Sequence, residues 1–243
     1  GSGALTRGDG AQVLNAAGDL AAAVGAISDD WNGFNVLHTA ASRVGGLDLG
    51  FLPGEGGHDV AGMQSTALDT VVLLGADELD MSSFGDAFVI YVGSHGDNGA
   101  HRADLILPGA AWTEQDGIFV NTEGRVQLAS RSVFPKGEAK ENWAIFRALS
   151  ERLGKTLPYD NLEQLRMKLF EDHPVFAGID HAPGAEGAAD FDAKAVGQAG
   201  DVADEAFTSP VSNFYFTNPI ARASETLAAC AALRSEPAKV AAE

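Results

Sequence analysis

The sequence predicts an α/β fold, with a mainly parallel sheet flanked by helices and a C-terminal helical extension. The main evidence is three short apolar runs rich in Val, Ile and Leu, at 70–75, 87–93 and 103–109. Continuous runs without polar alternation are typical of parallel strands buried on both faces. The spacer between the first two runs, about a dozen residues, is long enough for the crossover that a parallel pair needs. Amphipathic helical patterns on either side of the runs supply the flanking helices.

The residues before the first run predict one long helix and one short one. Helical spacing of apolar residues predicts a helix over 10–27, with Asp9 as its N-cap. Residues 34–51 favour a short helix that Gly45–Gly46 interrupts, and the glycine-rich stretch 52–63 predicts a loop.

A hairpin and a helix are predicted after the third run. Two short apolar segments flank the turn residues 121–124, which is the pattern of two strands joined by a tight turn. Aromatic and aliphatic residues at helical spacing then predict a helix over 140–153, with Gly154 as its C-terminal cap.

Two further helices complete the pattern. A leucine stripe predicts a helix over 161–172, opened by a capping box of Asp160 and Glu163. The last helix is expected to start at Asn218, the N-cap, with Pro219 in the first helical position.

The chain divides into three expected parts. Residues 1–174 form the α/β domain, which is expected to be incomplete, and 211–243 form a C-terminal helix and tail. Between them, 175–210 is an acidic linker rich in Gly and Ala. The segment 177–209 is expected to be a loose linker or to wrap the surface, with fast amide exchange.

Composition narrows the chemistry. The 243 residues include a single cysteine, Cys230, so a disulfide, an iron–sulfur cluster or a Cys-based zinc site within this chain is excluded. The formal net charge of −18 argues against nucleic-acid binding and against docking on anionic lipid. No apolar run approaches the roughly 20 residues that span a bilayer, so no direct membrane insertion is expected.

Polar clusters offer weak candidates for a metal or phosphate site. His95, Asp97, His101 and Asp104 lie close together in sequence, but their spacing matches no recognised ligand pattern, and solvated turn residues explain them better. Neither histidine has an identifiable partner for proton transfer. The glycine loops at 54–59 and 75–80 carry four acidic residues that would repel phosphate: Glu55, Asp77, Glu78 and Asp80.

The acidic stretch 112–125 is the remaining candidate. Glu114, Asp116, Glu123 and Arg125 could provide an acid and a base. An acidic loop followed by a Glu–Arg pair on one strand explains the same residues without catalysis. We therefore predict no catalytic, cofactor-binding or metal-binding residue, and Cys230 is expected to be a small core residue.

The stretch ADLILPGAAWTEQDGIFVNTEGRVQ, at 103–127, resembles the signature of the molybdopterin oxidoreductase superfamily. In that signature an A-D-x-x-L-P strand leads into E-x-x-G…N-x-E-G-R. Within the superfamily, the chain is most similar to the large iron–sulfur subunit of respiratory complex I. The segments that carry this closer resemblance are 31–51, 96–125, 141–160 and 214–230.

The resemblance implies a function. This chain would be a scaffold in a peripheral-arm subunit of NADH-quinone oxidoreductase, which moves electrons from NADH to quinone and couples this to proton translocation. The iron–sulfur clusters would belong to the N-terminal part of the full-length subunit, and the partners would be other peripheral-arm subunits. The implied location is the cytoplasmic face of the bacterial inner membrane or the matrix side of the mitochondrial one.

The chain departs from the pterin-binding relatives in two places. They usually have Asn where this chain has Asp77, and a Thr-Glu-Thr-like run where it has Asp97-Asn98-Gly99. A carboxylate near a pyrophosphate is electrostatically unfavourable, so no molybdenum or tungsten pterin is expected to bind. Two alternatives stay open: a fragment of a molybdopterin-dependent dehydrogenase, such as one acting on formate, and a module that binds a nucleotide-like ligand.

Overall fold

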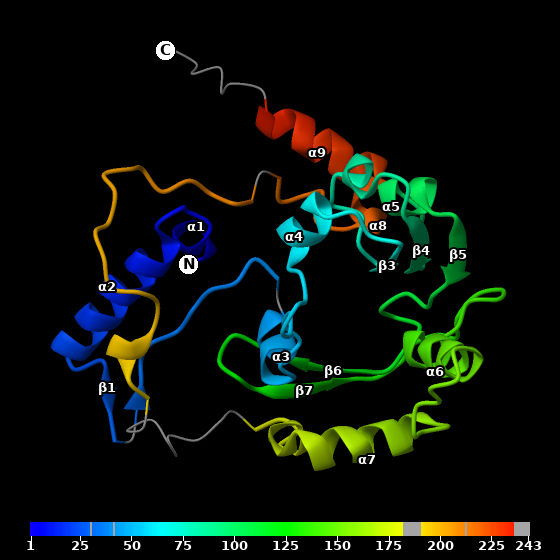
Figure 1. The fold of residues 1–243 in the computed structure, drawn as a ribbon, viewed down its shortest axis with the longest axis horizontal. Coiled ribbons are helices and arrows are strands. Elements are labelled where there is room, and N and C mark those ends of the chain that lie inside the picture. Colours follow the sequence, from blue (N-terminus) through cyan, green and yellow to red (C-terminus); the bar gives the residue numbers. More distant parts are fainter. Residues whose placement is uncertain (30, 41, 182–190, 212, 236–243) are drawn as a thin grey trace. The chain divides into compact units, whose positions relative to one another are not determined.

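A computed structural model describes residues 1–29, 31–40, 42–181, 191–211 and 213–235 (Figure 1). The helices are α1 (Ser2–Leu5), α2 (Gly10–Ala23), α3 (Arg43–Asp48), α4 (Val60–Ser65), α5 (Asn98–Arg102), α6 (Asn142–Arg152), α7 (Leu162–Asp172), α8 (Pro219–Arg222) and α9 (Glu225–Ser235). The strands are β1 (Ile27–Ser28), β2 (Trp31–Asn32), β3 (Thr70–Leu74), β4 (Phe88–Gly93), β5 (Leu105–Pro108), β6 (Gly117–Val120) and β7 (Val126–Ala129). Short 3-10 turns are η1 (Met81–Phe84), η2 (Pro174–Ala177) and η4 (Ala193–Ala195).

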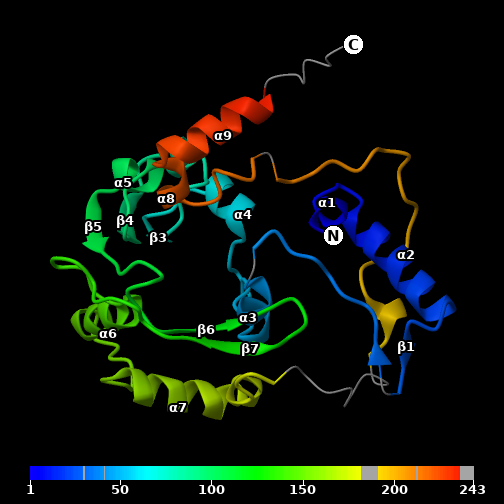
Figure 2. The ribbon, with the colours of Figure 1, turned by 180° about the vertical axis from the view of Figure 1, so that it is seen from behind.

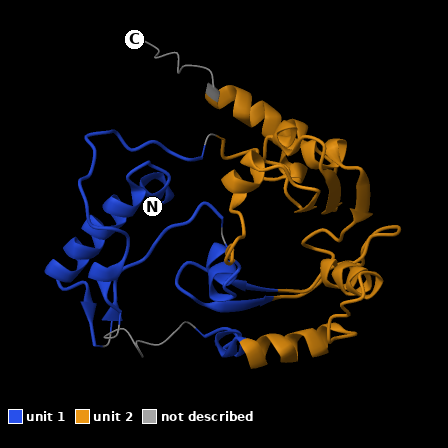
Figure 3. Ribbon diagram, in the orientation of Figure 1, with its two compact units in different colours: residues 1–51, 118–128, 173–212 blue, residues 52–117, 129–172, 213–243 orange. Residues whose placement is uncertain are grey.

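Contacts within the chain gather into two compact units (Figure 3). Unit 1 comprises 1–51, 118–128 and 173–212, and unit 2 comprises 52–117, 129–172 and 213–243. Each unit is therefore assembled from three separate stretches of sequence. The expected division at residues 174 and 210 stays a prediction.

The sheet of unit 2 is parallel, as predicted. Its strand order is β3-β4-β5, with Val72 beside Ile90 and Ile90 beside Leu105. Figure 2 shows the same sheet from behind, with α5 next to it. The predicted α/β fold, a parallel sheet with flanking helices, is confirmed.

One face of this sheet forms the core of unit 2. The buried members of that core are Val71, Leu73, Phe84, Ala87, Val89 and Tyr91. The opposite face is half exposed: Val72 keeps 44% of its accessible surface, Leu74 50% and Phe88 47%. Val92 is buried on this face too, at 1% exposed, but most of the face is open, so the expectation that the strands are buried on both faces is wrong for most of the sheet.

Several predicted boundaries need correction. The helix expected over 10–27 ends at Ala23, because Gly25 takes a left-handed conformation with φ of 69° that stops it. The loop expected over 52–63 contains the start of α4, whose first turn is capped by the Asp59 carboxylate accepting from the Gly62 amide.

The helix predicted within 34–51 is α3, and Gly45–Gly46 lie inside it rather than interrupting it. Gly45 is buried there for a packing reason. A Cβ at this position would lie 3.3 Å from Cγ2 of Val120, which is itself fully buried. The Ser42 hydroxyl accepts a hydrogen bond from the Val120 amide at 3.2 Å, so α3 is held against β6.

The hairpin at 117–130 and the helix ended by Gly154 are confirmed, the latter by a φ of 73° at that glycine. The capping box of α7 is shifted by one residue from the predicted pair. Asn161 Oδ1 accepts from the Gln164 amide, and Gln164 Oε1 accepts from the Asp160 amide. An amide pair therefore replaces the predicted pair of Asp160 and Glu163.

The C-terminal helix is broken in two. Asn218 caps α8 as predicted, through its side chain and the Ala221 amide. The helix stops after Arg222, and the Ser224 hydroxyl then accepts from the Leu227 amide at 3.3 Å to open α9.

In unit 1 the segment 191–211 is held against α1 and α2. Arg7 donates to Asp9 through two nitrogens, at 2.7 and 2.8 Å, and the Ala203 amide donates to the same carboxylate. The hydrogen bond from Arg7, with that from Ala203, lowers the pKa of Asp9 to about 2. In α2, Asn15 donates to the backbone carbonyls of Lys194 and Val196. This part of the expected linker 177–209 therefore packs, whereas 182–190 lie outside the described residues.

We expect Gly18→Ala to release this segment from α2. An added Cβ would lie 2.0 Å from the carbonyl oxygen of Ala193, so backbone must move. Alanine in place of glycine stabilises a helix by at most about 1 kcal/mol, and this gain does not offset such a clash. The amides of Gln198 and Ala203 are hydrogen-bonded in the wild type, so slow hydrogen–deuterium exchange is expected there, and the variant should exchange them faster.

Gly46→Ala is the matched control, because it adds a Cβ inside α3 with no atom within 4 Å. It should leave exchange at both amides unchanged. Equal exchange rates in wild type and Gly18→Ala would show that the contact with α2 does not hold the segment.

Candidate functional site

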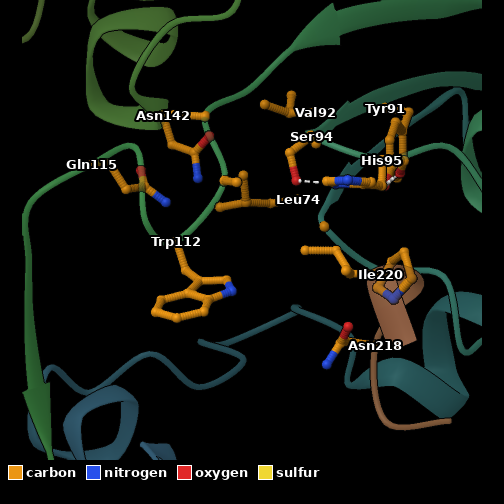
Figure 4. A pocket seen from close by; sticks show the side chains of 15 residues that line it. Leu74, Tyr91, Val92, Ser94, His95, Trp112, Gln115, Asn142, Asn218 and Ile220 are labelled. Carbon is orange, nitrogen blue, oxygen red and sulfur yellow. Dashed lines mark hydrogen bonds between the residues drawn. The ribbon is translucent and has the colours of Figure 1, made fainter. Parts of the chain in front are cut away.

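A pocket of about 320 Å³ lies at the carboxyl ends of β3 and β4 in unit 2 (Figure 4). Its lining residues are Leu74, Gly75, Tyr91, Val92, Gly93, Ser94, His95, Ala110, Ala111, Trp112, Gln115, Asn142, Asn218, Pro219 and Ile220. Ligands of open parallel sheets bind at this edge, because the loops that follow the strands converge there. The pocket is therefore the first place to look for a function.

The pocket is lined by apolar and neutral polar groups. Figure 4 shows the amides of Gln115 and Asn142 and the ring of Trp112 around the same space. Ser94 Oγ lies 3.0 Å from His95 Nδ1. The Asn142 Oδ1 atom is buried and has no hydrogen-bond partner among the described residues. None of the lining side chains is a carboxylate, an ammonium or a guanidinium, so a charged ligand would meet no opposite charge there.

The charged groups lie beside the pocket, around Asp77. This residue follows β3 and keeps only 1% of its accessible surface. One carboxylate oxygen accepts from the Gly99 amide at 2.6 Å, and the other accepts from the Tyr91 hydroxyl at 2.9 Å. Gly99 lies in α5, and a Cβ there would lie 2.7 Å from the Ala76 carbonyl, so only glycine allows this approach.

Arg222 of α8 joins three acidic residues to this cluster. Its Nε donates to Asp97, and its Nη1 donates to Glu78 at 3.0 Å. The remaining nitrogen, Nη2, lies 3.9 Å from the Asp77 carboxylate, an ion-pair distance without a hydrogen bond. Burial lowers the pKa of the Arg222 guanidinium, but hydrogen bonds to Asp97 and Glu78 outweigh this and raise it. We call these five residues, Asp77, Glu78, Tyr91, Asp97 and Arg222, the Arg222 network.

Tyr91 links the network to the pocket wall. Burial, and then the hydrogen bond to the Asp77 carboxylate, raise the pKa of its hydroxyl well above the ordinary value. The same hydroxyl lies 2.7 Å from the backbone oxygen of His95, so its single proton serves two acceptors.

We expect Tyr91→Phe to lower the free energy of unfolding at pH 7 by about 1–2 kcal/mol, because the Asp77 carboxylate loses a donor. Above pH 10 this gap should narrow. The folded state holds the Tyr91 proton more tightly than the unfolded state, so wild-type stability falls as pH rises past the unfolded tyrosine pKa of about 10. The variant lacks this proton, so above pH 10 its free energy of unfolding falls less steeply than that of the wild type, by up to about 1.4 kcal/mol per pH unit.

Urea unfolding of both proteins between pH 7 and pH 11.5 measures the difference directly. A gap that is constant over the whole range would show that the Tyr91 hydroxyl titrates alike in the folded and unfolded chains.

The cluster leaves little room for an anion at the sheet edge. The Gly99 amide, a backbone donor in the first turn of α5, is already bonded to the Asp77 carboxylate. Asp77, Glu78 and Asp97 together carry three formal negative charges against the one positive charge of Arg222. A pyrophosphate, the anionic part of a pterin dinucleotide, would meet carboxylates where it needs donors. The residues present therefore do not fit such a group.

The histidines and acids proposed for a metal site are dispersed among different partners. Asp97 pairs with Arg222, whereas Asp104 accepts from the Val89 amide at 2.8 Å and from Arg102 at 3.2 Å. His101, on α5, lines a polar hollow between α5 and η1, whereas His95 lines the pocket at the sheet edge. Within the described ranges, no three His, Cys, Asp or Glu side chains are placed to hold a metal ion.

The four acidic-stretch candidates have local structural roles. Glu114 accepts from the Ala111 amide at 3.0 Å, and Asp116 accepts from the Arg131 amide at 3.3 Å. Glu123 pairs with Arg125 at 3.3 Å as expected, but both residues lie in the turn between β6 and β7 rather than on a strand.

The structure also shows the positions of the remaining acidic candidates and of the cysteine. Asp80 caps η1, whereas Glu55 is exposed in a loop. Cys230 is a free, half-buried thiol on α9.

Sequence reasoning missed the residues that organise this edge. The apolar run that contains Tyr91 predicts only a strand there, and none of the expected site residues is Arg222. Arg222 is the only basic residue between 213 and 233, a signal that could have marked it as a partner for the acidic loops.

Comparison with known proteins gives two family matches. The Molybdopterin oxidoreductase family matches residues 1–152, and the family of the C-terminal region of the NADH-ubiquinone oxidoreductase G subunit matches residues 180–230. The first match includes β3, β4, β5 and the hairpin. Both agree with the resemblance carried by 103–127, which is thereby confirmed.

Individual relatives extend the match to most of the chain. The G subunit of the NADH-quinone oxidoreductase of Rickettsia bellii is 39% identical over 236 residues, 97% of this chain and 33% of the relative. The mitochondrial NADH-ubiquinone oxidoreductase 78 kDa subunit of Neurospora crassa is 41% identical over 211 residues, 86% of this chain and 28% of the relative. The chain thus spans about a third of the length of the curated relatives it matches. With more than half of its residues matched by the first family, the chain belongs to the molybdopterin oxidoreductase family.

Proposed function

We propose that this chain is a scaffold within a peripheral-arm subunit of NADH-quinone oxidoreductase, respiratory complex I. The observation that carries the proposal is the identity of about 40% to relatives that bear that name, over most of the chain. The assembly would transfer electrons from NADH to quinone, coupled to proton translocation, on the cytoplasmic face of a bacterial inner membrane or the matrix side of a mitochondrial one. Its partners would be other peripheral-arm subunits.

The chain would not enter the membrane itself. Across the part of the chain that the structure describes, every helix is too short or too polar to cross a bilayer. Association with a membrane complex would then depend on neighbouring subunits, and the charge of −18 favours neighbours with basic surfaces.

No redox cofactor would bind to this chain. The Arg222 network supports this. At the carboxyl edge of the sheet the Gly99 amide is bonded to Asp77, and the positive charge of Arg222 is neutralised by Asp97 and Glu78, so neither is left for a cofactor. The iron–sulfur clusters of the assembly would lie in other parts of the full-length subunit. Cys230, the one cysteine, cannot hold a cluster alone. A molybdopterin-dependent dehydrogenase, for example one acting on formate, is disfavoured by the same cluster.

A second candidate function is the binding of a nucleotide-like ligand through its uncharged nucleoside part. The pocket of about 320 Å³ at the sheet edge, with the unpartnered Asn142 Oδ1 among the described residues, favours it. A thermal-shift screen with nucleosides separates the two functions, since a specific ligand raises the apparent stability of the chain by mass action.

The test of the main proposal is native purification. The chain, tagged in its own host, is extracted from membranes in mild detergent, and the co-purifying subunits are identified by mass spectrometry. We expect NADH-dependent quinone reduction in the purified fraction. A chain that migrates free of such an assembly, or with formate oxidation instead, would contradict the proposal.

A further inference from the structure

The loop 130–140, between β7 and α6 in unit 2, combines exposed apolar residues with basic ones. Val133 keeps 53% of its accessible surface and Phe134 keeps 77%. The loop also carries Arg131, Lys136 and Lys140 against one acid, Glu138, in a chain with 16 basic and 34 acidic residues. Its local charge is therefore opposite to that of the whole chain.

The loop is held in place at both ends by backbone hydrogen bonds. The Ser132 and Val133 amides donate to the Thr113 carbonyl at 2.9 and 3.2 Å. At the other end, the Lys140 amide donates to the Pro108 carbonyl at 3.0 Å. The apolar tip is thus preorganised, which reduces the entropy lost when a partner orders it.

Arg131 stiffens the loop further. Its guanidinium stacks over the Phe134 ring at 4.5 Å and pairs with Glu141 at 2.9 Å. Glu141 also accepts from the Trp143 indole at 2.7 Å. Exposed aromatic residues next to arginine are the composition of interface hot spots.

These residues enclose a groove of about 320 Å³. Its lining residues are Arg131, Phe134, Pro135, Gly137, Ala139, Lys140, Glu141, Trp143 and Ala144. This volume suits one or two side chains of a partner rather than a large interface. Neither Lys136 nor Lys140 has an ion pair within the described part of the chain, so both ammonium groups are available.

We infer that residues 131–140 form a docking surface for an acidic segment of a neighbouring protein subunit. The partner segment places an apolar side chain in the groove beside Phe134, and its carboxylates lie near Lys136 and Lys140. Charge complementarity selects this partner, because an acidic segment is repelled by the rest of a chain of charge −18 and attracted at this loop. The inference rests on the proposed function only in that the partner belongs to the same assembly.

Other occupants fit the loop less well. A nucleic acid requires a broad basic face, whereas two unpaired lysines in an acidic chain offer few phosphate contacts. A second copy of this chain would also carry a net charge of −18, and the repulsion between two such chains opposes their association.

Photo-crosslinking in the assembled complex tests the inference. Phe134 is replaced by p-benzoylphenylalanine, the complex is irradiated, and the crosslinked peptides are sequenced. We expect a crosslink to a peptide of another subunit, with an Asp or Glu within a few residues of the attachment point. In that background Lys136→Glu should lower the crosslink yield about threefold, as for one exposed charge pair, and Lys155→Glu should leave it unchanged.

Leu153 is the matched control position for the p-benzoylphenylalanine substitution, because its side chain keeps 71% of its accessible surface in the same unit. A crosslink from 134 within this chain, to a second copy, or to a peptide without acidic residues would overturn the inference. So would no crosslink from 134, or an equal yield after Lys136→Glu. Co-purification of the chain with the complex is scored in the same sample, so loss of the assembly itself is distinguished from failure of the docking site.

Discussion

Asp77→Ala is expected to lower the free energy of unfolding of the chain by about 3–5 kcal/mol, because two hydrogen bonds to a charged group are lost and each contributes about 1.5–3 kcal/mol. The carboxylate is almost fully buried and accepts from the Gly99 amide and the Tyr91 hydroxyl. Without it, the buried Gly99 amide loses its acceptor, and the Tyr91 hydroxyl keeps only the His95 carbonyl. Urea unfolding followed by far-UV circular dichroism at pH 7 gives the value.

Asp86→Ala is the control, because Asp86 is exposed in the same unit. Substitutions at such surface positions usually change stability by less than about 0.5 kcal/mol. If both variants unfold at the same urea concentration, the Arg222 network does not stabilise unit 2 as described.

Arg222→Ala is expected to release the C-terminal residues from the sheet edge. Three carboxylates lose their shared cation, and charge-assisted hydrogen bonds of this kind contribute about 1.5–3 kcal/mol each. Hydrogen–deuterium exchange should become faster in α8 and α9, while β4 keeps its protection. A stability loss on the order of 2 kcal/mol should accompany it, because Arg222 is partly exposed and some of the interaction is screened.

Arg222→Lys separates charge from geometry. Lysine keeps the positive charge, but its single ammonium group cannot bond Asp97 and Glu78 in the directions that the planar guanidinium reaches. An intermediate loss of protection in α8 and α9 is expected. Full protection in Arg222→Ala would mean that packing alone holds these helices.

The sequence was sufficient for elements with strong local signals. The three strands of unit 2 follow from continuous apolar runs, and the end of α6 follows from Gly154. The ends of helices were harder to predict where several consecutive residues can act as the cap. The shift of the α7 box to Asn161 and Gln164 is an example, since Asp160 and Glu163 satisfy the same spacing.

The candidate site could not be predicted from the sequence, because its contacts are distant along the chain. Arg222 and Asp97 are 125 residues apart, and Tyr91 and Asp77 are 14 apart on opposite sides of a crossover. The departure of Asp77 from the residue usual in pterin-binding relatives was visible in the sequence. Its physical consequence, an internal acceptor for the Gly99 amide, required the structure.

We propose that this chain keeps the family fold and that the Arg222 network occupies the edge of the sheet where a cofactor would otherwise bind. The test is the molybdenum, tungsten and pterin content of the chain purified within its native assembly. We predict well below one equivalent of either metal and of pterin per chain. A content close to one equivalent would show that the cofactor binds despite the Arg222 network.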